Sequence, residues 1–211
     1  MRNQSATEVL LVRHGHVEST VPGSRFETKG DPPLSELGRA QAQTMADGLT
    51  KEQGLTTLYA SPLRRAMQTA QIIEHRLGVH PIECVDLREW GFGDKMGLLD
   101  RMGLLIATSL SRFTGAHKHL AFFWSRSPAL RAFASSVVTC LEGLAQQHPG
   151  ERIIVVAHAG TIDAILGYYF PKEEEWVRGV LRHCSVTRVL LEGGKARILE
   201  FNHVFSSTGG D

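Results

Sequence analysis

Two arginines, two histidines and one glutamate stand where their side chains could act together on a phosphate ester. They are Arg13, His14, Arg65, Glu89 and His158. Arginine guanidinium groups match phosphate oxygens in a bidentate way and stay charged at every relevant pH. Their positive charge lowers the pKa of a neighbouring histidine, so we expect the His14 imidazole to be neutral, with a free nitrogen lone pair. A neutral imidazole beside two arginines is a nucleophile that faces an anion-binding site.

Glu89 could complete such a site as its proton donor. If burial raised the pKa of this carboxyl group, it could protonate the oxygen that leaves the phosphorus atom. Guanidinium and imidazolium groups already supply the positive charge that a transferring phosphoryl group needs. The pattern therefore predicts a site that works with no metal ion and no other cofactor.

The same residues follow short apolar runs that are typical of buried strands. These runs cover residues 9–12, 55–60 and 153–157, and helical patterns separate them. In open α/β sheets, ligands bind at the carboxyl ends of the strands. We therefore expect the side chains that follow the three runs to converge on one crevice with the segment that carries Glu89.

Cap and stop residues indicate where the first helices begin and end. Ser35 is expected to cap a helix whose first turn holds Glu36, a position that the helix dipole favours for an acid. Ser61 and Pro62 are expected to open the next helix, with serine at the cap and proline at the first helical position. We expect that helix to stop at Gly78.

The second half of the chain alternates in the same way. Its expected elements are a long helix from about residue 129 to 148, a short helix after residue 157, an acidic helix from Pro171, and strands over 185–191 and 196–201. The long helix ends at a His-Pro-Gly stop signal. Gly193 and Gly194, between the last two strands, are a hairpin signal.

This alternation predicts an α/β fold. We expect a three-layer αβα sandwich with a mainly parallel central sheet and an antiparallel edge, because right-handed crossovers place helices on both faces. The length of 211 residues suits a single domain over 1–211, with a helical insertion at about 95–128 that could act as a lid.

Composition excludes several classes of protein. Lys and Arg total 23 against 22 for Asp and Glu, so the formal net charge of +1 gives no basic field to gather nucleic acid or an anionic membrane. No secretory signal is visible, and the most apolar long stretch, residues 96–110, is too short to span a bilayer. Three cysteines without C-x-x-C spacing suit a reducing compartment. We expect a cytoplasmic protein without nucleic-acid or membrane partners.

Five short motifs occur in order along most of the chain. They are Arg13-His14-Gly15, Leu34-Ser35-x-x-Gly38-x-x-Gln41-Ala42, Ser61-x-Leu63-x-Arg65-Ala66-x-Gln68-Thr69-Ala70, Leu87-Arg88-Glu89-x-x-Phe92-Gly93 and His158-Ala159-Gly160. Together they resemble the histidine phosphatase superfamily, which has the phosphoglycerate-mutase-like fold. The resemblance covers roughly residues 8–94 and 130–203.

The resemblance assigns roles to individual residues. It implies that His14 becomes transiently phosphorylated and that Glu89 is the proton donor. It also implies a set of residues that hold the phosphoryl group or contact the substrate: Arg13, Arg65, His158, Thr20 and Ala159. Thr20 stands where the family usually has asparagine, and its shorter side chain could still donate to a phosphate oxygen. The implied substrate is a small phosphorylated metabolite.

Departures from the family pattern leave alternatives open. His16 stands where the family usually has an acidic or amide residue, and Met96 where phosphatases have glutamate. Hydrolysis is favoured over a phosphoglycerate-mutase-type phosphotransfer, because Phe92 lacks a hydroxyl group and residues 95–128 lack the proline-rich arginine insertion of the mutases. A catalytically weak phosphate-binding or regulatory module of the same fold is a further alternative.

A metal-dependent hydrolase is a rival from another class. His14-Gly15-His16 has the His-x-His spacing of metal ligands, and His158 and Asp163 could complete a site. That interpretation leaves the two motif arginines without a role. The edge strands near the C-terminus could also pair two copies of the chain into a homodimer.

Overall fold

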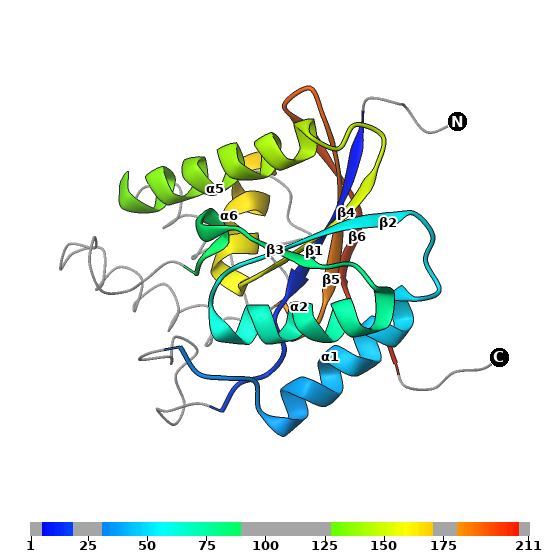
Figure 1. Cartoon of the computed structure of the whole chain (residues 1–211). Helices are drawn as coiled ribbons and strands as arrows, with labels where there is room; N and C mark the ends of the chain where they lie inside the picture. Colours follow the sequence, from blue (N-terminus) through cyan, green and yellow to red (C-terminus); the bar gives the residue numbers. More distant parts are fainter. Residues whose placement is uncertain (1–5, 19–30, 90–127, 171–180, 207–211) are drawn as a thin grey trace.

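The computed structural model of this chain describes residues 6–18, 31–89, 128–170 and 181–206 (Figure 1). The predicted insertion at about 95–128 lies outside the described residues except for its last position. Thr20 also lies outside them. The acidic helix expected from Pro171 also lies outside them. Among the described residues, no helix combines the length and the apolar character needed to cross a membrane.

A six-stranded sheet forms the centre of the molecule (Figure 1). Its strands are β1 (Thr7–Arg13), β2 (Leu55–Ala60), β3 (Pro81–Glu83), β4 (Arg152–Ala157), β5 (Val186–Glu192) and β6 (Lys195–His203). They lie in the order β3-β2-β4-β1-β5-β6. The pairs β2–β3, β2–β4 and β1–β4 are parallel, whereas β1–β5 and β5–β6 are antiparallel. The predicted mainly parallel sheet with an antiparallel edge is confirmed.

Helices cover both faces of the sheet, which confirms the three-layer sandwich. Helices α1 (Glu36–Leu49) and α2 (Arg64–Leu77) pack on one face with Leu10 and Val12 of β1. Helices α5 (Pro128–Gln146) and α6 (Ala159–Tyr169) pack on the other face with Val9 and Leu11. Alternate side chains of a strand point to opposite faces, so a strand covered on both sides must be apolar throughout.

Three of the local signals act as predicted. The Gly38 N–H donates to Ser35 Oγ over 3.0 Å, so Ser35 caps α1. Gly78 ends α2 in the left-handed conformation with φ of 70°. Gly193 and Gly194 form the two-residue turn between β5 and β6 with φ of 55° and 73°, values that a type I′ hairpin turn requires.

The predicted start of α2 was wrong. The helix begins at Arg64, its cap residue is Leu63, and no side chain caps it. Ser61 instead lies 2.8 Å from a ring nitrogen of His158, Oγ to Nε2, and its backbone N–H donates to Val156 O over 2.9 Å. Ser61 therefore contacts β4 and His158 instead of capping the helix, although serine has a local preference for capping.

Two short elements that lead into the motif with Glu89 were missed. Strand β3 has only three residues, with exposed or partly exposed side chains, and the 3₁₀-helix η1 (Val85–Leu87) follows it after Cys84. Neither is long enough to show a hydrophobic period. Both matter for function because they lead the chain from the edge of the sheet to Glu89.

An ionic network holds the end of the sheet that lies away from the predicted site. Arg152, the first residue of β4, has an exposed side-chain fraction of 9% and donates to Glu8 over 2.8 Å and to Glu52 over 2.6 Å. Arg188 of β5 donates to Glu52 through Nη1 over 2.8 Å and to Glu200 over 2.6 Å. The network ties β4, β1 and β5 to the loop after α1.

Replacing Arg152 by alanine should destabilise the protein much more than replacing an exposed arginine. We expect Arg152→Ala to lower the free energy of unfolding by at least about 2 kcal/mol, because it leaves partly buried carboxylates without one of their donors. Arg76→Ala, which removes an exposed ion pair with Asp47, should cost less than about 1 kcal/mol. Urea unfolding of both variants measures the difference, and equal losses would contradict a structural role of the network.

Candidate active site

The carboxyl ends of β1 and β4 bring His14 and His158 together. The two strands are adjacent and parallel, with Arg13 paired to Ala157, so the next residue of each strand is a histidine. Their ring centroids lie 5.1 Å apart. The His14 backbone N–H donates to Ala157 O over 3.1 Å, which continues the ladder to the site. Strand register therefore sets the spacing of the two imidazoles.

The protonation of His14 follows from its two hydrogen bonds. Nδ1 lies 2.7 Å from the carbonyl oxygen of Gly15, which can only accept, so Nδ1 carries the proton. Arg65 donates its Nε–H to Nε2 over 3.2 Å, so Nε2 holds the lone pair. Burial lowers the pKa of His14 well below its usual value, and the charges of His158, Arg13 and Arg65 lower it further. The imidazole is neutral, and its lone pair lies on Nε2.

The loop after β1 depends on a close crossing of two backbones. A Cβ on Gly15 would lie 2.5 Å from Gly38 O, and a Cβ on Gly38 would lie 2.0 Å from His16 O. Neither position has room for a side chain. The Gly15 N–H donates to Thr69 Oγ1 over 3.1 Å, and the His16 N–H donates to Gln41 Oε1 over 3.0 Å. The motif residues of α1 and α2 thus hold the loop that carries His14.

His158 is fully buried and is oriented by a serine. Ser61 Oγ accepts the Leu63 N–H over 3.3 Å, so its own proton can go to Nε2 of His158, 2.8 Å away. Within the described ranges, Nδ1 of His158 has no hydrogen-bond partner. Burial lowers the pKa of His158 well below its usual value, and Arg65 and Arg13 add to the effect. Ala159 follows as the first residue of α6, whose N-terminus favours an anion.

Arg65 lies at the centre of the site. It is 4% exposed, and its Nη1 lies 3.6 Å from Asp31 Oδ1. Burial lowers the pKa of Arg65, while the charges of Glu89 and Asp31 oppose that effect. An arginine keeps its charge at neutral pH under such shifts. The neighbouring Arg64 is exposed.

Arg13 is held by a segment that the sequence analysis missed. Its Nη1 donates to Leu181 O, and its Nη2 lies 3.3 Å from Nε2 of His183. His183 donates its Nδ1–H to His14 O over 3.2 Å, which leaves Nε2 as the acceptor for Arg13. Burial, and to a smaller extent the charge of Arg13, lowers the pKa of His183 to about 4. A neutral histidine therefore connects the motif arginine to the motif histidine. The signal available in the sequence was a histidine shortly before the strand that pairs with β1.

Glu89 reaches the site over a glycine of α6. A Cβ on Gly160 would lie 2.5 Å from Glu89 Oε1, so this carboxyl group needs glycine beneath it. Thr161 donates its hydroxyl proton to Arg88 O over 3.1 Å and so fastens the segment to α6. Asp163 lies one turn further along the helix. Burial raises the pKa of Asp163 to about 7, and the charge of Glu89 contributes to the rise.

The geometry does not favour the metal interpretation. The imidazole of His14 lies between a carbonyl group and a guanidinium group, and His16 Nδ1 lies 2.8 Å from Ser35 Oγ. Within the part of the chain that the structure describes, no group of three or more potential ligands is spaced to hold a metal ion. The charges that act on the carboxyl group of Asp163 are those of Glu89 and Arg13.

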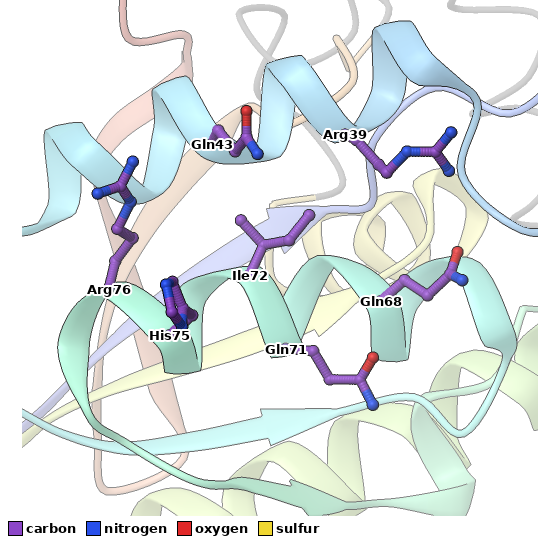
Figure 2. Close-up of a pocket in the computed structure, with 7 residues that line it drawn as sticks. All are labelled: Arg39, Gln43, Gln68, Gln71, Ile72, His75 and Arg76. Atoms are coloured by element: carbon purple, nitrogen blue, oxygen red, sulfur yellow. The ribbon is translucent and has the colours of Figure 1, made fainter.

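A hollow on another face of the molecule is distinct from this site. Figure 2 shows it between α1 and α2, lined by Arg39, Gln43, Gln68, Gln71, Ile72, His75 and Arg76. Its two arginines already have partners, because Arg39 donates to Leu34 O over 2.7 Å and Arg76 pairs with Asp47 over 3.0 Å. The histidines at the strand ends do not line it.

Comparison with known proteins places the chain in a family. The model of the histidine phosphatase superfamily (branch 1) matches residues 9–204. Metal-independent phosphoserine phosphatase from Arabidopsis thaliana is 32% identical over 202 residues, which are 90% of this chain and 78% of that protein. Phosphoglycerate mutase-like protein 4 from the same plant is 31% identical over 159 residues, 75% of this chain and 69% of that protein. The native structure of mycobacterial glucosyl-3-phosphoglycerate phosphatase matches with a TM-score of 0.68 and 25% identity, covering 93% of this chain and 99% of that chain.

This chain belongs to the histidine phosphatase superfamily, which confirms the resemblance carried by its motifs. It is a histidine phosphatase, a hydrolase of phosphoric monoesters. The phosphohistidine mechanism is general to the superfamily.

The carboxyl group of Asp163 should make stability depend on pH. Its pKa of about 7 in the folded chain lies above the ordinary value of 3.8, so the folded state holds a proton that the unfolded chain releases. The extra proton that the folded state holds on Asp163 contributes to its stability. This contribution is fully present below about pH 4 and is lost as the pH rises to about 7. We therefore expect Asp163→Asn to be more stable than the wild type by about 2 kcal/mol at pH 8, with the difference shrinking toward zero near pH 4.

Urea unfolding at several pH values measures this difference. The buried histidines titrate in the wild type and in the variant alike, so they cancel in the comparison. Asp47→Asn, at an exposed carboxylate of α1, is the matched control for the loss of one acidic side chain. An Asp163→Asn advantage that is the same at pH 4 and pH 8 would contradict the raised pKa.

Proposed function

We propose that this chain hydrolyses a small phosphorylated metabolite through a phosphohistidine on Nε2 of His14. The observation that carries the proposal is the buried, neutral imidazole whose lone pair points at a guanidinium donor. An incoming phosphoryl oxygen can take over the Nε–H of Arg65, which frees the Nε2 lone pair for the phosphorus atom. Arg13 and Nδ1 of His158, which has no partner among the described residues, lie beside the same position and would bind the remaining oxygens.

In the first half of the reaction, the Nε2–phosphorus bond forms and the phosphorus–oxygen bond of the ester breaks. Glu89 donates a proton to the departing oxygen, so an alcohol leaves rather than an alkoxide. His14 gains positive charge as its nitrogen bonds to phosphorus. The Gly15 carbonyl oxygen on the Nδ1–H, 2.7 Å away, stabilises that charge.

In the second half, water attacks the phosphorus atom of the phosphohistidine. Glu89, now a carboxylate, accepts a proton from that water, and the Nε2–phosphorus bond breaks. Inorganic phosphate leaves, and His14 returns to its neutral form. The same carboxyl group thus acts as acid and then as base, which leaves the protonation of the enzyme unchanged over one cycle.

The substrate we propose is a small phosphomonoester. Relatives named for phosphoserine and for glucosyl-3-phosphoglycerate support this class. A phosphoglycerate-mutase-type transfer is the alternative that a mutase-like relative keeps open. The two differ in product, because a hydrolase releases inorganic phosphate whereas a mutase returns an isomeric phosphate ester. A catalytically weak binding module would bind phosphate or vanadate without either product.

Location and assembly belong to the same proposal. We propose that the protein acts in the cytoplasm, where phosphorylated metabolites and reduced cysteines are both maintained. Strand β6 forms one edge of the sheet and could pair with its counterpart in a second copy.

Removing the imidazole of residue 14 should abolish turnover. We expect His14→Ala to show only background hydrolysis of p-nitrophenyl phosphate in excess EDTA, because the nucleophile is gone. Wild-type enzyme quenched during turnover of a radiolabelled ester should carry an acid-labile, base-stable phosphate on residue 14. The control is His75→Ala, which changes an exposed histidine of α2 and should behave as the wild type. Radiolabel on any residue other than His14 would contradict the assignment of the phosphohistidine to His14.

The role of Glu89 should depend on the leaving group. We expect Glu89→Gln to lower kcat/KM about 10²- to 10⁴-fold for alkyl phosphates, which need a protonated leaving oxygen. The loss should be much smaller for p-nitrophenyl phosphate, whose leaving group is stable as an anion. The matched control is Glu83→Gln, an exposed glutamate of β3. Equal losses with both substrates would argue against Glu89 as the acid.

A further inference from the structure

Two of the three cysteines lie against each other although 56 residues separate them. Cys84 Sγ and Cys140 Sγ are 3.2 Å apart, and both thiols are free. Cys84 stands between β3 and η1, and Cys140 lies in α5. Both side chains are partly buried, so a small reagent can reach them, whereas Cys184 is buried. The catalytic cycle described above uses neither sulfur.

The surroundings make Cys84 the better nucleophile of the pair. The Cys140 S–H stabilises a thiolate on Cys84, and the backbone N–H groups of Asp86 and Leu87 at the start of η1 also donate to it. Together these donors lower the pKa of Cys84 to about 7. The same contact raises the pKa of Cys140. A thiolate fraction near neutral pH is the condition for thiol–disulfide exchange.

We propose that Cys84 and Cys140 form a reversible disulfide site that is loaded by low-molecular-weight disulfides. The Cys84 thiolate attacks one sulfur of the small disulfide, which places a mixed disulfide on Cys84 and releases one thiolate. Cys140 then loses its proton to solvent and attacks Cys84 Sγ, which closes the protein disulfide and releases the second thiolate. The two cysteines lose two protons and two electrons, and one small disulfide is reduced to two thiols.

The fold already holds the two sulfurs near bonding distance. A disulfide bond of about 2.05 Å requires the sulfurs to approach by about 1 Å from their present positions. The elements that carry them are packed together, because Leu87 of η1 is buried in the same apolar cluster as Val137 and Leu141 of α5. The Cys84 backbone N–H donates to Ala60 O over 2.8 Å, which fixes the start of η1 to the sheet. Closure therefore needs side-chain rotation and no unfolding.

The disulfide would restrain the segment that carries the proposed proton donor. Glu89 follows Cys84 by five residues, and residues 84–89 reach the site along η1. A Cys84–Cys140 bond would fasten the start of that segment to α5. Only this consequence rests on the proposed role of Glu89. Formation of the bond depends on the two thiols alone.

The experiment treats the folded, full-length chain with oxidised glutathione and follows it by intact mass and non-reducing peptide mapping. We expect the wild type to lose two hydrogens, to yield a joined Cys84–Cys140 peptide, and to regain the original mass with dithiothreitol. Cys140→Ser should retain glutathione on Cys84, because the second thiol is missing. Cys84→Ser should react at least about tenfold more slowly, because the activated thiol is gone.

Cys184→Ser is the matched control and should form the disulfide at the wild-type rate. A stable glutathione adduct on Cys84 of the wild type would overturn the proposal, since it would show that Cys140 cannot reach. Faster modification of Cys184 than of Cys84 would overturn it as well. Neither result depends on phosphatase activity, so failure here and failure of the proposed function are distinguishable.

Discussion

The site depends on keeping one imidazole neutral and pointed in a single direction. His14 achieves this with a carbonyl acceptor on Nδ1 and a guanidinium donor on Nε2, and the side chains of His14 and Arg65 are both buried. Burial alone disfavours the imidazolium ion, and the nearby cations add to that effect. In the proposed reaction the same cations attract the phosphate dianion, so one arrangement of charge would both prepare the nucleophile and bind its target.

The arginines at the two ends of the sheet have different kinds of hydrogen-bond partner. At the amino ends of β1 and β4, Arg152 lies against the carboxylates of Glu8 and Glu52, which balance its charge. At the carboxyl end of β1, two partners of Arg13 are a carbonyl oxygen and a neutral imidazole, which orient the guanidinium group. Carboxylates therefore hold the arginine at one end of the sheet, while hydrogen bonds to neutral groups orient Arg13 at the other.

The antiparallel edge contributes to the site as well as to the sheet. Strand β5 pairs with β1, and the residues just before it supply Leu181 and His183 as supports for Arg13 and His14. Helix α6 has a similar double use, because it covers one face of the sheet and presents Gly160 beneath Glu89. Supports of this kind hold the reacting groups in place, and exact placement matters because proximity supplies much of the rate of an enzymatic reaction.

Local chemistry in the sequence determined every strand except β3, the Ser35 cap, the Gly193-Gly194 turn and the motif residues that meet at the strand ends. Each of these depends on a few neighbouring residues or on strand order, so it can be predicted from the sequence. Only the tertiary structure decided that Ser61 supports His158 instead of capping a helix, that His183 links Arg13 to His14, and that Asp163 lies near Glu89. It also brought Cys84 against Cys140. These contacts join segments that are far apart in the chain, and no local preference encodes them, because they arise from how helices pack on a sheet of fixed register.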